Sequence, residues 1–243
     1  MSALLLRIIA CTAMLLDHIG YCYDIDPLRC LGRIAFPIFV FLLCNGYRYT
    51  TNKLRYGLRL AIFALISQVP YSLLLANSVW REKGNVFVTL LLALICIWTI
   101  DALLKKNLWP VAFLPTLVIV GMYHFGVIES DYGVRGILFA LVFFFFAREG
   151  NQKPLFLITG MLCAIYYPVA FRYFQWFMDG PLPHISNWEA TQIYSLLALP
   201  LIVSYNGKKG STPSAPALSK LTQLGFYQFY PVHMLVLWMI RTS

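Results

Sequence analysis

The sequence predicts an all-α integral membrane protein, a polytopic bundle of about nine transmembrane helices. Of its 243 residues, 60% are hydrophobic and only 12% are charged, and the mean hydropathy is +0.70. These values lie far outside the range of soluble globular domains, so the lipid bilayer is the expected solvent. At about 20 residues per span, the chain accommodates eight to ten helices and no separate soluble domain. We therefore expect residues 1–243 to form a single transmembrane domain.

The first half of the chain supplies five predicted spans. In order, they are 4–23, 31–47, 56–76, 84–103 and 108–125. Each is a run of apolar residues bounded by charged residues or by Gly and Pro. The first run lacks a small-residue cleavage site, so we interpret it as a span and not as a removed signal peptide. Because Pro115 interrupts the fifth run, eight or ten spans remain as alternatives.

The second half supplies four more predicted spans and two unusual loops. The spans are 132–148, 154–172, 190–206 and 221–240. Residues 173–189 combine aromatic residues with Gly and Pro, a composition typical of an interfacial loop or a re-entrant turn on the outer side. Residues 206–219 are rich in Gly, Ser, Pro and Lys, which predicts a linker on the inner side.

The basic residues indicate how the chain is oriented. The formal net charge of +9 would suggest nucleic acid as a partner for a soluble protein. In a membrane protein it is explained by insertion orientation and anionic lipid head groups, so no nucleic-acid partner is expected. With the N-terminus inside, 12 of the 19 Lys and Arg residues fall on the inner side. The sequence therefore predicts a multi-pass protein of the cell (inner) membrane with a cytoplasmic N-terminus.

Familiar catalytic and metal-binding motifs of soluble enzymes are missing from the sequence. It contains no GxSxG, P-loop or GxGxxG motif, and no two histidines are spaced three or four residues apart. We therefore expect no metal site. The six cysteines form no CxxC and mostly lie in apolar runs, which is typical of small core residues. Only Cys22 and Cys30 flank one loop and could pair.

A few ionisable residues lie inside predicted spans, where they are costly and therefore point to a function. Asp17 and His18 lie in the first span and His233 in the last, while Arg33 and Arg135 open the second and sixth spans from the outer side. At 1.5 Å of rise per residue, His18 lies about 21 Å and His233 about 18 Å from the inner edge. The two histidines are thus predicted to share one level of the bundle.

Asp17 and His18 must have different roles, because neighbours on a helix point about 100° apart. We interpret His18 as a general base facing a cavity, with Asp17 turned toward Arg33 or Arg135. The competing interpretation is a structural ion pair and a hydrogen-bonded core histidine. Gln68 and Asn85 could supply neutral donors and acceptors nearby.

Six ordered segments carry a resemblance to a known family. They are LLDHIG at 15–20, GRIAFPIFVFLLCNGYRYT at 32–50, RLAIFALISQVPY at 59–71, NVFVTLLL at 85–92, DYGVRGILFAL at 131–141 and FYPVHM at 229–234. In this order they cover nearly the whole chain, which resembles the TraX family of transmembrane acetyltransferases. The resemblance implies acetyl transfer from acetyl-CoA to an amine or hydroxyl acceptor at the membrane. The best-known acceptor is a pilin N-terminus, and the looser implication is a peptide or an envelope glycan.

The resemblance assigns roles to the polar residues. His18 would take a proton from the acceptor, while Arg33, Arg135 or Asn85 would stabilise the oxyanion. His233 is a second acid/base candidate that could protonate the leaving thiolate or carry the acyl group. Two further groups complete the predicted set: Gln68 and Tyr132 for substrate, and the inner residues Lys53, Arg55 and Arg59 for the phosphates of the acyl donor.

Two other functions remain as alternatives. A small-molecule transporter or flippase would also place charged residues at mid-depth in a many-helix bundle. An idle membrane scaffold would use the same cluster only to hold its helices together. Replacing His18 with Ala separates these possibilities, because only the enzyme should lose activity while keeping its fold.

Overall fold

The computed structural model describes residues 1–79, 83–148, 151–179, 191–210 and 216–243, and most of these residues are helical. The one sheet among the described residues consists of two antiparallel strands of two residues each. The elements are α1 (Ala3–Cys22), α2 (Asp26–Gly32), α3 (Ala35–Tyr49), α4 (Lys53–Ala76), α5 (Val86–Lys105), η1 (Trp109–Val111), α6 (Leu114–His124), α7 (Gly133–Phe146), β1 (Ala147–Arg148), β2 (Asn151–Gln152), α8 (Pro154–Asp179), η2 (Gln192–Leu197), α10 (Ala198–Val203) and α11 (Pro216–Thr242).

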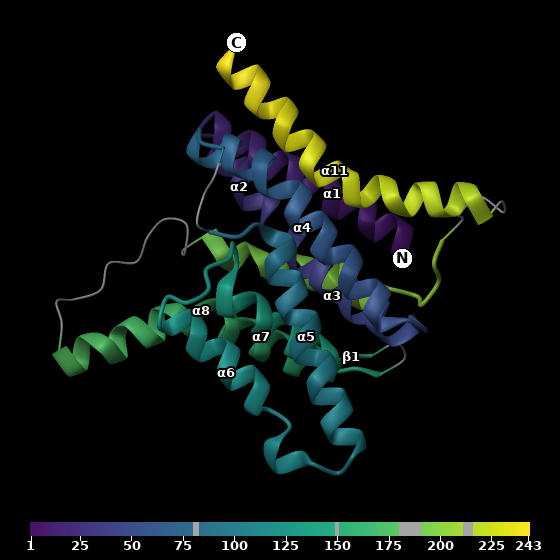
Figure 1. Ribbon diagram of the computed structural model, residues 1–243, viewed down its shortest axis with the longest axis vertical. Coiled ribbons are helices and arrows are strands. Elements are labelled where there is room, and N and C mark those ends of the chain that lie inside the picture. The colour runs from purple at the N-terminus through teal and green to yellow at the C-terminus, as the bar shows by residue number, and fades with distance from the viewer. Residues whose placement is uncertain (80–82, 149–150, 180–190, 211–215) are drawn as a thin grey trace.

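The helices form a bundle around α3 (Figure 1). Helix α1 packs against α2, α3 and α11, and α11 also packs against α4. Helix α7 packs against α3, α5 and α8. Phe41 of α3 and Phe139 and Phe143 of α7 are almost completely buried between these helices. The first and last helices therefore lie side by side on one flank of the core.

Four helical segments are long and apolar enough to cross a membrane. They are Ala3–Cys22, Asp26–Tyr49, Lys53–Ala76 and Val86–Lys105. Large apolar side chains such as Leu65 of α4, 78% exposed, lie on the outside of the bundle, where lipid rather than water would cover them. These features indicate a membrane protein. Four shorter apolar helices follow in the chain, so the predicted count of nine spans stays a prediction.

Several element boundaries differ from the sequence prediction. Helix α8 continues to Asp179, so 173–179 is helix and not loop, while 180–189 lies outside the described residues. The predicted span 190–206 is a 3-10 helix followed by the six-residue α10, which contains Pro200. Helix α11 begins at Pro216, inside the predicted linker, because proline is well tolerated in the first turn of a helix.

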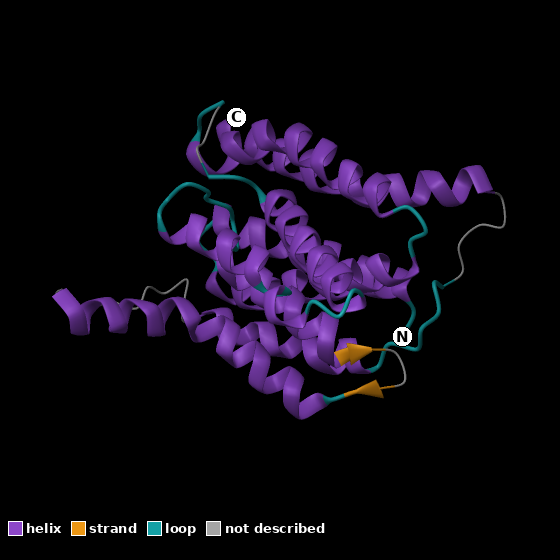
Figure 2. Cartoon of the chain, turned by 60° about the horizontal axis from the view of Figure 1, so that its bottom comes forward, coloured by secondary structure: helices purple, strands orange, loops and turns teal. Residues whose placement is uncertain are grey.

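Helix α11 bends along its length (Figure 1), and it lies along one side of the bundle while α8 projects from the other (Figure 2). Pro231 lies inside α11 and lacks the backbone N–H that would continue the helical hydrogen bonds. The bend accompanies a change of packing partner, because α11 contacts both α4 and α1. The possible Cys22–Cys30 disulfide is not formed, and both thiols are free.

Candidate functional site

A polar cavity of about 190 Å³ lies at the end of α1, next to the joint between α2 and α3. It brings together mainly charged and aromatic side chains from five parts of the chain. They are Asp17, His18, Tyr21, Arg29, Arg33, Tyr71, Leu75, Lys83, Asp131 and Tyr132. Four of the residues that the sequence singled out, Asp17, His18, Arg33 and Tyr132, therefore lie around one space.

His18 and His233 form a hydrogen-bonded pair at the inner wall of this cavity. Nδ1 of His18 lies 2.8 Å from Nε2 of His233. Nδ1 of His233 lies 2.6 Å from the carbonyl oxygen of Phe229, one turn earlier in α11. His233 is 7% exposed, whereas His18 lines the cavity. The predicted shared level of the two histidines is thus matched by a direct contact.

The contacts of His233 fix which nitrogen of His18 is available. A carbonyl oxygen only accepts hydrogen bonds, so Nδ1 of His233 carries a proton. In a neutral imidazole the other nitrogen is then an acceptor, so Nε2 of His233 accepts from Nδ1–H of His18. Nε2 of His18 is consequently the nitrogen with a lone pair, which is the form a general base requires.

Asp17 forms a buried ion pair with Arg33. Nη2 of Arg33 donates to Oδ1 of Asp17, and Nε of Arg33 donates to the carbonyl oxygen of Arg29 at 3.2 Å. Gly32 makes this approach possible, because a Cβ at that position would lie 2.2 Å from Cβ of Asp17. Of the two predicted partners for Asp17, the structure selects Arg33. Arg135 is buried on α7 and does not line the cavity.

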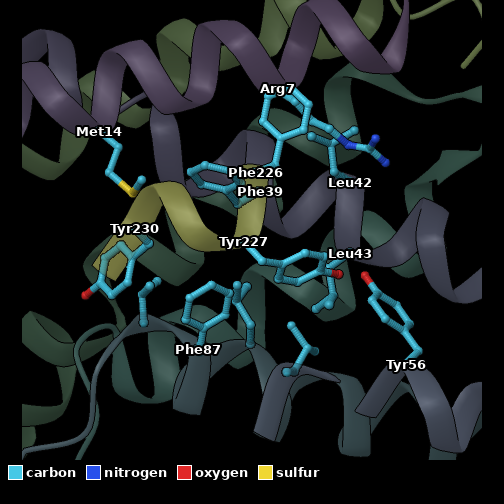
Figure 3. A pocket seen from close by; sticks show the side chains of 13 residues that line it. Arg7, Met14, Phe39, Leu42, Leu43, Tyr56, Phe87, Phe226, Tyr227 and Tyr230 are labelled. Carbon is cyan, nitrogen blue, oxygen red and sulfur yellow. The ribbon is translucent and has the colours of Figure 1, made fainter. Parts of the chain in front are cut away.

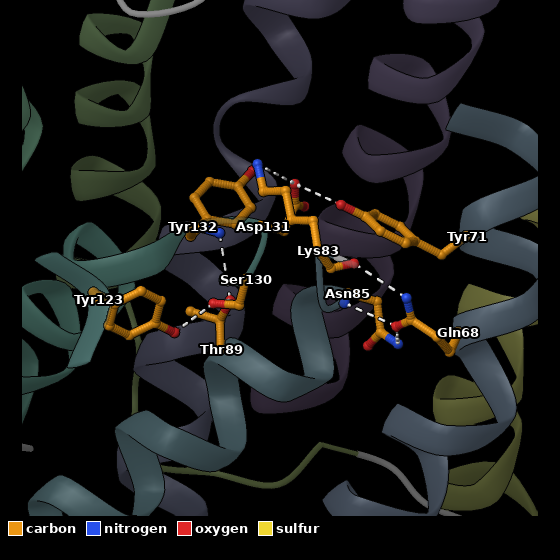
Figure 4. A network of polar contacts seen from close by, with 9 residues as sticks. All are labelled: Gln68, Tyr71, Lys83, Asn85, Thr89, Tyr123, Ser130, Asp131 and Tyr132. Carbon is orange, nitrogen blue, oxygen red and sulfur yellow. Dashed lines mark hydrogen bonds and ion pairs between the residues drawn. The ribbon is translucent and has the colours of Figure 1, made fainter. Parts of the chain in front are cut away.

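The two loops that precede α5 and α7 form the rim of the cavity (Figure 4). They are tied by a bridge between Gly84 and Ser130, with the amide of Gly84 donating to the carbonyl of Glu129 at 3.0 Å. Lys83 on one loop lies 4.0 Å from Oδ1 of Asp131 on the other. The hydroxyl of Tyr71 donates to the same oxygen at 3.5 Å. A lysine and a carboxylate therefore face each other at the mouth.

Hydroxyl groups behind the rim hold Tyr132 in place. Thr89 donates to Ser130 at 2.8 Å and accepts from the backbone amide of Tyr132 at 3.4 Å. The Tyr132 ring stacks on Phe36, with their centroids 3.5 Å apart. The hydroxyl of Tyr132 lines the cavity and can donate a hydrogen bond.

Gln68 and Asn85 are predicted to bind substrate, but in the structure they form hydrogen bonds with each other and with the backbone of the rim. The Asn85 amide donates to Oε1 of Gln68 at 2.9 Å and to the carbonyl of Ala64 at 2.7 Å. The Gln68 amide donates to the carbonyl of Lys83 at 3.1 Å. Neither residue lines the polar cavity. Their contacts position the loop that carries Lys83.

A second, mainly apolar cavity of about 100 Å³ lies between α1, α3, α4, α5 and α11 (Figure 3). Arg7 and the hydroxyl groups of Tyr56 and Tyr227 supply most of its polar atoms. Arg59 lies over the Tyr227 ring, 5.6 Å from the centroid. Arg55 is exposed at the start of α4, and Lys53 pairs with Asp101 at 3.4 Å. Of the predicted phosphate contacts, only Arg59 lies beside this cavity.

Sequence reasoning missed several lining residues. Asp131 is part of the quoted DYGVRG segment but was not assigned a role, and Arg29 and Lys83 were interpreted only as charges that set orientation. Arg7 was also counted only as an inner charge, although it lines the apolar cavity. The available signal was position: Arg7 precedes Met14 by seven residues and His18 by eleven, which places all three on one face of α1.

Comparisons with known proteins extend over nearly the whole chain. A family model described as TraX protein matches residues 2–241. The chain is 28% identical over 252 residues to a protein of Dichelobacter nodosus named probable fimbrial assembly protein FimC, serogroup H1. This alignment covers 97% of the chain and 94% of that relative. No solved structure matches the chain.

Proposed function

The chain belongs to the TraX protein family, as its ordered motifs predict, and from this membership we propose that it is a membrane-embedded acyltransferase. It transfers acetyl from acetyl-CoA to an amine or hydroxyl acceptor at the membrane. The observation that carries the proposal is the His18–His233 pair, which leaves Nε2 of His18 as the nitrogen with a lone pair and places His18 on the wall of a polar cavity inside an apolar bundle. A structural ion pair and a core histidine would need no such cavity.

The chemistry follows from the hydrogen bonds of the two histidines. Nε2 of His18 takes a proton from the acceptor as its nitrogen or oxygen attacks the thioester carbon. A bond to the acceptor forms, the C–S bond breaks, and the same proton then passes to the departing thiolate. The imidazolium that forms on His18 donates through Nδ1–H to His233, which stabilises the intermediate charge. His233 is thus a positioning residue in this scheme.

The oxyanion is stabilised by donors that line the same cavity. The guanidinium of Arg33 is held by Asp17 and by the backbone of Arg29, so its direction is fixed before substrate binds. The hydroxyl of Tyr132, which lines the cavity, is the second donor. Donors that are already oriented stabilise developing charge without the cost of reorganisation.

The acceptor enters from the rim. A pilin N-terminus is the acceptor that best fits a family member related to a fimbrial assembly protein, and a peptide or an envelope glycan is the broader class. The carboxylate of Asp131 at the mouth suits the positive charge of an N-terminal amine before it loses its proton. Lys83 is then displaced from Asp131 by the incoming amine.

The chain spans the cell (inner) membrane as one polytopic domain with a cytoplasmic N-terminus. About nine spans are proposed, of which the four long helices are the clearest. With this orientation the rim loops lie on the outer side. The acetyl donor then approaches from the cytoplasm and the acceptor from outside, and the two meet at His18.

The proposal is tested with acetyl-CoA that is labelled in its acetyl group and with protein purified in nanodiscs. The measurement is the rate at which the label appears in a synthetic peptide with a pilin N-terminus. We compare the unmodified chain with His18→Ala. A positioned general base contributes about 10²- to 10⁴-fold, so His18→Ala should lose at least 99% of the transfer rate while eluting as a folded monodisperse species. His124→Ala is the matched control, because His124 is exposed and remote from the cavity.

Transfer that persists in His18→Ala would contradict the assignment of the base. Binding of acetyl-CoA or acceptor without any transfer by the unmodified chain would instead favour a transporter or flippase. Loss of folding in His18→Ala, with no transfer by the unmodified chain, would favour the scaffold.

A further inference from the structure

Three cavities follow α1 along one face. The apolar cavity is lined by Arg7 and Met14, and a small one of about 30 Å³ by Met14, Asp17 and His18. The polar cavity is lined by Asp17, His18 and Tyr21. Neighbouring cavities thus share lining residues along the whole row. A ligand that entered beside Arg7 would therefore reach His18 by moving along the helix.

The other helices repeat this order. On α3 the apolar cavity is lined by Leu43 and Phe39, and the small cavity by Phe39 and Phe36. On α11 Tyr230 lines both of these cavities, and His233 follows it by three residues. The apolar cavity and the small cavity are therefore both lined by α1, α3 and α11.

Cationic and hydroxyl groups gather at the end of the row farthest from His18. Arg7 lines the apolar cavity together with Tyr56 and Tyr227, and Arg59 lies over the Tyr227 ring. The hydroxyls of these two tyrosines face each other across the cavity (Figure 3). Arg7 also lies over the Phe226 ring, 5.9 Å from the centroid. Two arginines with hydroxyl donors at the mouth of an apolar passage suit a phosphate group at the end of an apolar chain.

The distance along the row is the second constraint. Arg7 precedes His18 by eleven residues in α1, which corresponds to about 16 Å of helix. The pantetheine arm of coenzyme A joins its sulfur to the first phosphorus through about 13 bonds, and at about 1.2 Å per bond an extended arm spans about 16 Å. A phosphate bound at Arg7 would place the thioester beside His18.

We propose that the row of cavities is the binding site for the phosphopantetheine arm of the acyl donor, with Arg7 and Arg59 binding the phosphates at its mouth. The inference rests on the proposed function and deepens it, because it assigns a donor site that is separate from the acceptor rim. Met14, Phe39 and Tyr230 surround the arm between the two ends.

The test compares two donors that differ only beyond the arm. Acetyl-CoA carries the phosphates, whereas S-acetylpantetheine has the same thioester and arm without them. In the double variant Arg7→Gln/Arg59→Gln, kcat/KM for acetyl-CoA should fall about 10- to 100-fold, mainly through KM, because charge-assisted contacts to phosphate are lost. The kcat/KM for S-acetylpantetheine should change less than about 2-fold, which also shows that the variant is folded.

Calorimetric binding of coenzyme A alone provides a readout that needs no transfer. The double variant should bind it about 10- to 100-fold more weakly, and Lys106→Gln should bind it normally. Lys106 is the matched control, because it is an exposed cation at the same predicted side of the membrane.

The outcomes separate this inference from the proposed function. If the double variant binds coenzyme A more weakly while the unmodified chain transfers acetyl to no acceptor, the proposed binding site for the phosphopantetheine arm (the arm site) is supported. The same result overturns the proposed acyltransferase activity. Normal transfer with an unchanged KM for acetyl-CoA in the double variant overturns the arm site and leaves the acyltransferase standing. Equal losses with both donors would also overturn the arm site, because the phosphates would then not be what the arginines bind.

Discussion

At the scale of single residues, the two histidines are predicted to contribute unequally. His233→Ala removes the acceptor that fixes the tautomer of His18 but leaves the base itself. Loss of such a supporting hydrogen bond typically costs about 10- to 100-fold in activity. We therefore expect kcat to fall by that factor in His233→Ala, and by more in His18→Ala. Steady-state transfer rates at saturating acetyl-CoA measure this difference.

The reverse ranking would show that His233 is the group in contact with substrate. His233→Gln is the matched variant, since its side-chain oxygen can still accept from Nδ1–H of His18. It should retain more activity than His233→Ala. Equal activity in both variants would contradict the supporting role.

The Asp17–Arg33 pair leads to a prediction about stability. Arg33 is 3% exposed, so replacing the Asp17 carboxylate by an amide removes the negative charge that is paired with a buried guanidinium. Breaking a buried ion pair in this way costs about 3–5 kcal/mol. Asp17→Asn should therefore unfold at a clearly lower temperature in detergent, as measured by intrinsic fluorescence. A variant that loses activity at unchanged stability would show instead that Asp17 acts directly in the chemistry.

The residues inside the spans could be predicted because buried charge is rare. The sequence alone placed His18 and His233 at one level and directed Asp17 to an arginine of another helix, and both contacts are present. It could not separate Arg33 from Arg135, because that choice depends on which helices pack together. Gln68 and Asn85 were assigned to substrate for the same reason: their depth was predicted, but not their contacts with each other.

At the scale of elements, the joint between α2 and α3 depends on one glycine. Gly32 lies against α1, where an added Cβ would overlap Cβ of Asp17. The added atom cannot be accommodated by a flexible side chain end, so the helices must separate. Such overpacking typically costs about 1–3 kcal/mol. Gly32→Ala should therefore lower the melting temperature and the transfer rate together.

Gly121→Ala in α6 is the control for this effect. An added Cβ there has no atom within 4 Å, so the variant should melt at the same temperature or slightly higher. A similar loss in both variants would mean that the close approach at Gly32 does not determine stability.

Element boundaries were the least predictable part of the fold. Apolar composition locates a span but does not say where its helix ends, and α8 continues through 173–179 although aromatic residues there suggested an interface. The predicted eighth span contains Pro200 and folds as short helical pieces. Local backbone constraints and tertiary packing decided these ends, and neither is visible in hydropathy alone.

At the scale of the whole molecule, α5 shows how far the rim lies from the opposite end of the bundle. Lys83 and Asn85 precede α5 and Lys106 follows it, so the 20 residues of the helix place Lys106 about 30 Å from the rim. This length matches the hydrocarbon core of a bilayer. The donor mouth and the acceptor rim are therefore expected on opposite sides of the membrane.

The orientation of the bundle decides whether donor and acceptor can meet as proposed. Val79 in the rim loop is 66% exposed, so a membrane-impermeant maleimide should label Val79→Cys in intact cells, whereas Lys106→Cys should react only after permeabilisation. The unmodified chain, with its six thiols, sets the background. The opposite pattern would place the rim in the cytoplasm. Acetyl-CoA would then meet Lys83 and Asp131 first, and the mouth beside Arg7 would face a compartment without the donor, so both the N-terminal orientation and the arm site would be wrong.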